Sequence, residues 1–178
     1  MIVVSDTITL TAITINDQRK LFELMSRIYL PEYIHLWFDN GSWYMEKIYS
    51  YTNMERDLAN HNSFYYFVQY RSKTIGILKL IENIPLVEFK NRKSAKLDRI
   101  YLDPAFHGQG IGKTLLNWTE KRLAASGHSL LWLEAIDTQK KAVVFYEKMN
   151  FQICGTFKLE FELIHANLRG MYRMYKSI

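Results

Sequence analysis

The chain has 178 residues, which is enough for one domain that buries about 70% of the surface of its unfolded chain. Its net charge of +5 at pH 7 suits an anionic ligand, but lysine and arginine are scattered along the sequence, which argues against a nucleic-acid-binding protein. No apolar run approaches the ~20 residues of a membrane-spanning helix, and the single cysteine excludes an internal disulfide framework.

The ends and the composition of the chain predict its location and its domain organisation. The first residues have neither the basic region nor the long apolar region of a secretory signal peptide. Together with the lone Cys154, which suits a reducing compartment, this predicts a cytoplasmic protein without membrane contact. We find no repeat, linker or shift in composition, so residues 1–178 are expected to form a single domain.

The chain begins with a predicted strand and a predicted helix. Residues 7–15 alternate apolar residues with threonine, which is typical of a strand. Asn16 and Asp17 have the chemistry of a helix start, and apolar residues at helical spacing continue from there to Pro31. An aromatic-rich stretch, residues 29–51, follows this helix.

A short helix and a hairpin are predicted next. Thr52 and Glu55 have the spacing of a capping box, which predicts a helix that ends at Asn60. Residues 63–70 and 74–82 are rich in β-branched and aromatic side chains, and we expect them to pair as a β-hairpin.

The second half of the chain alternates strands and helices. A basic loop over residues 84–94 leads to a strand that Asp103 and Pro104 stop, because proline cannot donate a ladder hydrogen bond. The remaining predicted elements are a helix from Ile111 to a glycine cap near Gly127, a buried strand over residues 130–135, a helix from Gln139 to Met149, and two strands over residues 151–159 and 170–177.

Three glycines at alternate positions, Gly108, Gly110 and Gly112, join the strand that ends at Leu102 to the next helix. A helix start carries unpaired N–H groups and a positive partial charge, and glycine lets the backbone approach an anion closely. Lys113 adds a cation in the first turn. This pattern predicts a phosphate-binding turn, and a tight turn without a ligand is the alternative.

Two common phosphate loops do not fit this turn. The Walker loop requires a glycine where this sequence has His107, and the dinucleotide fingerprint requires Gly-x-Gly-x-x-Gly rather than Gly-x-Gly-x-Gly. A third pattern, Gln/Arg-x-x-Gly-x-Gly/Ala between a strand and a helix, fits at Gly110 and Gly112. His107 stands where that pattern has glutamine or arginine.

A second segment, residues 139–151, is similar to the pattern Asn-x-x-Ala-x-x-Phe-Tyr-x-x-x-Gly-Phe. Gln139 replaces the asparagine, and Asn150 replaces the glycine, a position at which asparagine tolerates a left-handed helix cap. On these two motifs, the chain resembles the GNAT superfamily of acetyl-CoA-dependent N-acetyltransferases. The resemblance implies an α/β fold with a mixed, mostly antiparallel twisted sheet of about seven strands and helices on both faces.

The resemblance also implies a cofactor, acetyl-CoA, and the residues that bind it. In that family the loop amides bind the pyrophosphate, and the pantetheine arm pairs with strand backbone exposed where two central strands splay apart. Here these strands would be residues 100–102 and 130–135. His107 could donate a hydrogen bond to a phosphate or simply cap the turn. The implied cofactor-binding residues are Ile100, Tyr101, Leu102, His107, Gly108, Gln109, Gly110, Ile111, Gly112, Lys113, Gln139 and Tyr146.

Two residues are candidates for catalysis by direct attack of an amine on the thioester. Tyr146 matches the family's tyrosine acid, and a phenol of pKa ~10 can protonate a thiolate whose conjugate acid lies near ~8.5. An ordinary aromatic on an amphipathic helix is the alternative.

The predicted general base is Asp98, because at strand parity it would share the face of Ile100 and Leu102. Glu134 on the neighbouring strand is the rival, and a structural role is the alternative for either carboxylate. The histidines show no metal-ligand spacing, so we predict no metal.

The first half of the chain is expected to bind the acceptor. Its aromatic residues could line an amine pocket with three carboxylates, or form an aromatic core; these residues are Tyr33, Trp37, Trp43, Tyr44 and Tyr49 with Glu32, Asp39 and Glu46. The layout resembles bacterial spermidine/spermine N-acetyltransferases of the Pai type. We therefore expect a small polyamine-like primary amine; a protein or peptide acceptor and a non-catalytic acyl-CoA-binding module stay open, and a homodimer is compatible with the sequence.

Overall fold

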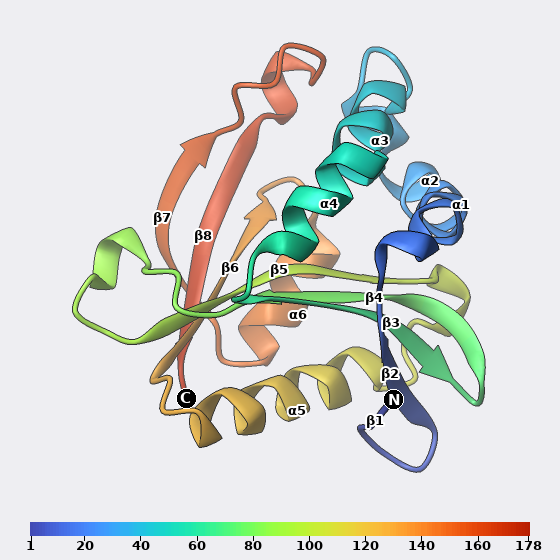
Figure 1. Ribbon diagram of the computed structural model, residues 1–178. Helices are drawn as coiled ribbons and strands as arrows, with labels where there is room; N and C mark the ends of the chain where they lie inside the picture. Colours follow the sequence, from blue (N-terminus) through green and yellow to red (C-terminus); the bar gives the residue numbers. More distant parts are fainter.

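The computed structural model describes residues 1–178, which form one eight-stranded sheet in the order β1-β2-β3-β4-β5-β6-β8-β7 (Figure 1). Only β5 and β6 pair in parallel. The sheet has one more strand than expected, because the two residues of β1 pair with β2 at the edge. The strands are β1 (Ile2–Val3), β2 (Ile8–Ala12), β3 (Ser63–Tyr70), β4 (Lys73–Ile81), β5 (Ser94–Leu102), β6 (Leu130–Ile136), β7 (Gln152–Lys158) and β8 (Gly170–Ser177).

Helices cover both faces of the sheet, as expected (Figure 1). One face packs against α5 and α6 around buried residues such as Leu115 and Val143, and the other packs against the N-terminal helices around Met25 and Tyr49. The helices are α1 (Gln18–Ile28), α2 (Leu30–Tyr33), α3 (Ser42–Tyr49), α4 (Tyr51–Ala59), α5 (Ile111–Ala125) and α6 (Lys140–Lys148).

The turn chemistry explains the β3–β4 hairpin. Arg71 and Ser72 both have positive φ angles, of 46° and 66°. Two consecutive left-handed residues define the type I′ turn, whose twist matches that of the flanking strands. Tyr70 therefore pairs directly with Lys73, and the predicted hairpin is confirmed.

The capping box predicted at Thr52 and Glu55 is wrong. With Thr52 as its cap, the helix would begin at residue 53; α4 begins two residues earlier, at Tyr51, and its cap is Ser50, whose side chain accepts a hydrogen bond of 3.3 Å from the amide of Asn53. A serine N-cap satisfies one of the free amides of the first turn, so no reciprocal glutamate is needed.

The two central strands separate after a short shared segment. β5 and β6 pair only from Ser94 and Leu130 to Leu97 and Leu133. Beyond Leu97, β5 pairs with β4 alone, and the ribbon shows β5 and β6 diverging (Figure 1). The expected splay is therefore present, and it leaves one edge of the end of β5 without a strand partner.

A β-bulge in β5 lies where this separation begins. Lys79 of β4 pairs with Arg99, whereas Leu80 pairs with Leu97, so Asp98 has no partner. A bulge inserts one residue and changes which side chains share a face. Leu97 and Ile100 pack into the core beneath α5 and α6. On the opposite face, Asp98 contacts Lys79 and Arg99 contacts Asp57.

Candidate active site

The turn before α5 presents backbone N–H groups that have no acceptor in the protein. Within this turn, the amide of His107 bonds Pro104 and the amide of Thr114 bonds Gly110, but the amides of residues 108–113 donate no hydrogen bond. They lie at the N-terminus of a 15-residue helix, where the helix dipole is positive. This is the arrangement that binds an anion such as phosphate.

Glycine is required at two positions of this turn by backbone conformation. Gly108 and Gly110 have φ angles of 77° and 76°, and a Cβ added at either would meet no atom within 4 Å. The space in front of the amides is therefore open. At Gly112, a Cβ would lie 3.2 Å from the ring of Phe145, so this glycine allows α5 and α6 to pack closely.

His107 bonds the turn itself. Its Nε2 lies 3.1 Å from the carbonyl oxygen of Leu102. A carbonyl can only accept, so Nε2 carries the proton in this contact. His107 was expected either to bind the cofactor or to cap the turn, and this contact favours the cap. The contact also occupies the carbonyl of Leu102, which belongs to the strand backbone that was expected to contact a cofactor.

A cavity of about 760 Å³, called here the larger cavity, lies in front of the turn. All of the predicted cofactor-binding residues line it except Gln109. Its other lining residues include Lys141 on α6 and Glu32 on α2. The structure therefore brings residues of both sequence motifs and of the end of β5 to one cavity.

Tyr146 lies where this cavity meets a second one. It lines both the larger cavity and a cavity of about 250 Å³, called here the smaller cavity. Its hydroxyl makes no hydrogen bond within the protein, which leaves it free for a ligand. Burial raises the pKa of Tyr146 above its ordinary range, so the hydroxyl stays protonated at neutral pH.

The C-terminal cap of α6 fixes Tyr146 in place. Asn150 has a φ of 66°, and the amide of Phe151 bonds the carbonyl oxygen of Tyr146 at 3.0 Å. The amide of Asn150 bonds Glu147 at 2.9 Å, which completes a Schellman motif. The rings of Tyr146 and Phe151 also pack edge to face, with 5.7 Å between centroids. The predicted left-handed cap at Asn150 is thus confirmed, and it holds the candidate acid.

Gln139 also lines both cavities, but its amide has a second contact. Its Nε2 lies 3.5 Å from Nε2 of His35, across the opening between the N-terminal segment and α6. A long glutamine side chain can therefore contact either the cofactor or this histidine.

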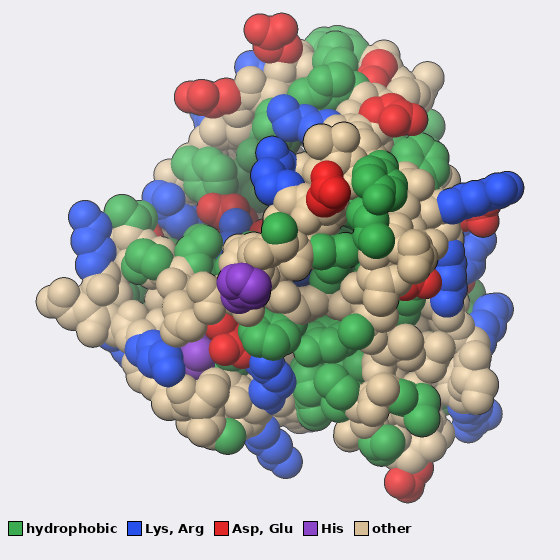
Figure 2. Space-filling model, in the orientation of Figure 1, with side chains coloured by type: hydrophobic (Ala, Val, Ile, Leu, Met, Phe, Trp, Pro, Cys, Tyr) green, Lys and Arg blue, Asp and Glu red, His purple; other side chains and the backbone are tan.

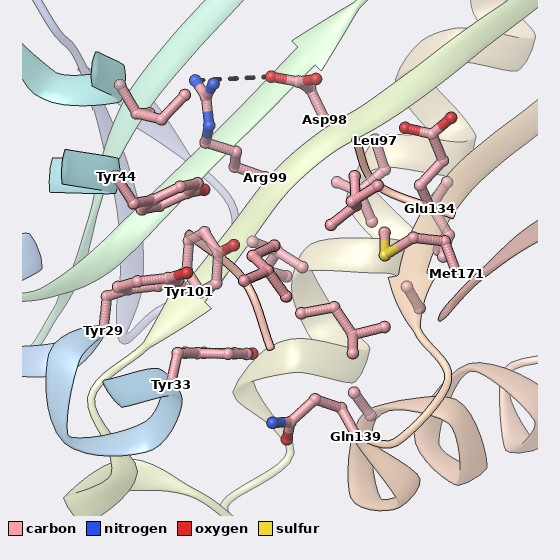
Figure 3. A pocket seen from close by; sticks show the side chains of 18 of the residues that line it. Tyr29, Tyr33, Tyr44, Leu97, Asp98, Arg99, Tyr101, Glu134, Gln139 and Met171 are labelled. Atoms are coloured by element: carbon pink, nitrogen blue, oxygen red, sulfur yellow. Dashed lines mark ion pairs between the residues drawn. The ribbon is translucent and has the colours of Figure 1, made fainter. Parts of the chain in front are cut away.

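The smaller cavity has aromatic walls (Figure 3). Tyr29 stacks on Tyr33 with ring centroids 4.5 Å apart and on Tyr44 with centroids 4.7 Å apart. Tyr101 meets Tyr29 edge-on at 5.4 Å. The stacked rings and the apolar side chains from β5 and β6 enclose the space between them, and Trp37 and Phe161 also line it.

Asp98 lines the smaller cavity but does not share the face of Ile100, so the parity argument for it is wrong. The bulge turns Asp98 toward a cluster of cations, at 3.2 Å from Lys79, 3.5 Å from Arg99 and 3.8 Å from Lys96. Burial alone would raise its pKa, but the nearby Arg99, Lys79 and Lys96 outweigh burial and lower it. The carboxylate is therefore firmly ionised and a weaker base than expected.

Glu134, the rival base, also lines the smaller cavity. Its carboxylate pairs with Lys96 at 2.7 Å, and it is the more exposed of the two, with 27% of its side chain accessible against 16% for Asp98. Figure 3 shows Asp98 and Glu134 on the same side of the cavity. Both candidates are thus in reach of a ligand there.

The predicted acceptor residues lie in different parts of the structure, and only some of them line a cavity. Tyr33, Trp37 and Tyr44 line the smaller cavity, whereas Tyr49 is fully buried and Trp43 packs on Trp37. Of the three carboxylates, Glu32 lines the larger cavity, Glu46 lines neither, and Asp39 caps α3 by accepting from the amide of Trp43 at 2.6 Å. No carboxylate expected to bind the amine therefore lies in the smaller cavity.

The sequence interpretation missed several residues of the site. Arg99 and Lys96 line the smaller cavity, and Lys79 supports them with 3% of its side chain exposed. A signal was present: Lys79 interrupts an otherwise apolar buried strand, and a charge at such a position is nearly always paired. Phe161 had no local signal, because it comes from the loop between β7 and β8.

No group of three or more histidine, cysteine, aspartate or glutamate residues is arranged to hold a metal ion. None of the helices is both long and apolar enough to cross a membrane. On the face shown in Figure 2, lysine and arginine side chains are interspersed with acidic ones rather than gathered in one patch.

Comparison with known proteins gives a family match over most of the chain. Residues 22–151 match the model of the acetyltransferase (GNAT) family. A curated relative, an uncharacterized N-acetyltransferase in the pepI 3' region of Lactobacillus delbrueckii subsp. lactis, is 28% identical over 58% of this chain and 60% of its own length. The chain therefore spans a little over half the length of the curated relatives that it matches.

Several solved structures have the same fold. PaiA N-acetyltransferase from Thermoplasma acidophilum, in complex with coenzyme A, has a TM-score of 0.72 at 20% identity and covers 97% of this chain and 99% of its own. Spermidine N-acetyltransferase from Vibrio cholerae, with CoA and spermine, has a TM-score of 0.69 at 22% identity, over 97% and 96% of the chains. The Salmonella typhimurium enzyme that modifies the N-terminal serine of ribosomal protein L7/L12 has a TM-score of 0.75 at 17% identity, over 99% and 98%.

Proposed function

Because the chain belongs to the acetyltransferase (GNAT) family, we propose that it transfers the acetyl group of acetyl-CoA to the primary amine of a small molecule. The observation that carries this proposal is the row of unbonded amides at residues 108–113, which opens on the same cavity as the hydroxyl of Tyr146. The two features would bind a diphosphate and act on a thioester at the far end of one ligand.

The residues of the larger cavity fit coenzyme A. The free amides and Lys113 would hold the diphosphate, and Lys141 offers a second cation. Near Ile100, the edge of β5 that faces β6 has no strand partner, and its backbone groups would bond the amides of the pantetheine arm. When bound, the cofactor supplies an acetyl thioester whose carbonyl carbon an amine can attack.

The chain's own residues would then move two protons. Tyr146 holds a proton at its free hydroxyl and would donate it to the departing sulfur. An amine of pKa ~10.4 arrives as an ammonium ion and must lose a proton before it can attack. Asp98 is the predicted acceptor of that proton and Glu134 the alternative, directly or through water; both line the cavity in which the amine would lie.

Two acceptor classes have support among proteins of the same fold. The Vibrio cholerae enzyme is named for spermidine, which agrees with the polyamine-like acceptor expected from the sequence. The Salmonella enzyme acts on a protein N-terminus. The smaller cavity, at about 250 Å³, is below the usual ~300–1,000 Å³ of small-ligand pockets, which favours a small amine over a peptide.

Two measurements test the proposal on the purified protein. Coenzyme A at millimolar concentration should raise the melting temperature, because a ligand that binds only the native state stabilises it. Acetyl-CoA with a panel of primary amines should release free thiol in proportion to acetylated product. A protein whose melting temperature is unchanged by coenzyme A, and which releases no thiol above the uncatalysed rate, would exclude the proposal.

A further inference from the structure

The side chains that line the smaller cavity indicate what kind of amine it can hold. Of its 22 lining residues, 17 are hydrophobic. The other five are Lys96, Asp98, Arg99, Glu134 and Gln139. An amine that enters this cavity therefore meets aromatic and aliphatic surface almost everywhere, and any charge it carries must be matched by these few polar groups.

The carboxylates of the cavity are already paired with cations. Glu134 lies 2.7 Å from Lys96, and Asp98 lies within 4 Å of Lys79, Lys96 and Arg99. Behind them, Asp57 of α4 lies 2.6 Å from Lys79 and 3.3 Å from Arg99. The cluster thus contains three carboxylates and three cations, and its net charge is zero.

The tyrosines add no negative charge. Burial raises the pKa of Tyr33 to about 12, and it also raises the pKa values of Tyr29 and Tyr101 above their ordinary range. These phenols are neutral at physiological pH. Their ring faces can attract one ammonium group, but each additional buried ammonium would need a carboxylate of its own.

From this arrangement, and on the basis of the proposed function, we infer that the acceptor is a monoamine: one primary amino group on an aromatic or aliphatic body without a second positive charge. The stacked Tyr33, Tyr29 and Tyr44 form a wall for a flat or aliphatic body. Trp37 and Phe161 line the cavity as well. The amino group would lie between Tyr146 and the paired carboxylates. A polyamine would bring ammonium groups for which the cavity has no free counter-charge.

Two amines of one skeleton test the inference on the wild-type protein. We expect kcat/KM for n-butylamine to exceed that for putrescine, which adds one ammonium group to the same carbon chain, by at least ~100-fold. Phenethylamine should be used at least as well as n-butylamine, because its ring adds apolar contact. Spermidine and an N-terminal serine peptide complete the panel, with thiol release as the measurement.

A charge variant tests the reason for the preference. Lys96→Met removes one cation and leaves the cluster with a net negative charge, so the ratio of kcat/KM for n-butylamine to that for putrescine should fall by about tenfold or more. Lys176→Met is the matched control. Lys176 pairs with Glu120 at 2.7 Å and has 17% of its side chain exposed, against 16% for Lys96, but it lines neither cavity. The control should keep the wild-type ratio.

The outcomes separate this inference from the proposed function. Turnover of putrescine, spermidine or the peptide as efficient as that of the monoamines would overturn the inference while the acetyltransferase activity stands. A coenzyme A-dependent rise in melting temperature without transfer to any of these amines would also overturn it, and the cofactor site would remain. Absence of both the thermal shift and thiol release would reject the proposed function itself.

Discussion

Tyr146 is the residue on which the proposed chemistry depends. Its hydroxyl is free, its helix is held by the cap at Asn150, and it faces both cavities. Replacing it with phenylalanine keeps the ring and its packing on Phe151 but removes the proton. We expect Tyr146→Phe to lower kcat by ~10²–10⁴-fold, the usual contribution of a general acid, with the dissociation constant of coenzyme A changed by less than about threefold.

Tyr175→Phe is the control for this variant. Its hydroxyl bonds Gln152 at 3.2 Å, and it lines neither cavity, so kcat should stay at the wild-type value. Steady-state kinetics and calorimetric titration measure the two quantities. If Tyr146→Phe lowers affinity for coenzyme A as much as turnover, the residue has a packing role and the assignment of the acid is wrong.

Gly110 tests the anion-binding turn at the level of one residue. Gly110→Asp should abolish binding of coenzyme A at millimolar concentration, because it places a negative charge and a side chain in the open space before the free amides. Gly127 at the other end of α5 has the same φ of 76°, so Gly127→Asp carries the same backbone strain away from the cavity. It should lower stability by ~1–2 kcal/mol and leave affinity unchanged. If the two variants bind coenzyme A with equal affinity, the turn is not part of the binding site.

Among the secondary-structure elements, the bulge in β5 affects both the stability of the fold and the lining of the smaller cavity. It directs Asp98 and Arg99 to one face, where they form the ion cluster with Lys79 and Asp57. The pKa of Asp98 is lower in the folded protein than in the unfolded chain. Ionised Asp98 therefore stabilises the fold at pH values above its unfolded pKa of ~3.9, and this contribution is lost as the pH falls through the folded pKa.

The pH dependence of unfolding measures this contribution. Urea unfolding of wild type and Asp98→Asn should give a difference in the free energy of unfolding that is constant above pH ~5 and that shrinks as the pH falls below ~3.9. A difference for Asp98→Asn that grows on acidification would show that folding raises the pKa of Asp98 instead of lowering it.

Most elements could be predicted from local pattern, because the periodicity, turn residues or cap that marks each one spans only a few residues. The β3–β4 hairpin, the buried strand β6 and the glycine cap after α5 all lie where the sequence placed them. The bulge was missed although it has a signal: apolar residues occupy odd positions up to Leu97 and even positions from Ile100, and this change of phase across Asp98 and Arg99 marks one inserted residue.

At the scale of the whole molecule, the smaller cavity arises from segments far apart in the sequence. The loop between β7 and β8 closes on the segment before α3, where the amide of Phe38 bonds Leu163 at 2.9 Å and the amide of His165 bonds Leu36 at 3.0 Å. This contact brings Phe161 beside Trp37. Periodicity and motifs describe local order only, so they could locate the predicted phosphate-binding turn but not the far wall of the smaller cavity.

The proposed function requires that the free amides after β5 bind a diphosphate and so place a thioester beside Tyr146. Calorimetric titration of the wild-type protein with coenzyme A and with pantetheine, which lacks the diphosphate, tests it directly. We expect coenzyme A to bind at least ~100-fold more tightly than pantetheine, because only coenzyme A gives the amides an anion to bind. Equal affinities for the two ligands, or no heat of binding with coenzyme A at millimolar concentration, would contradict it.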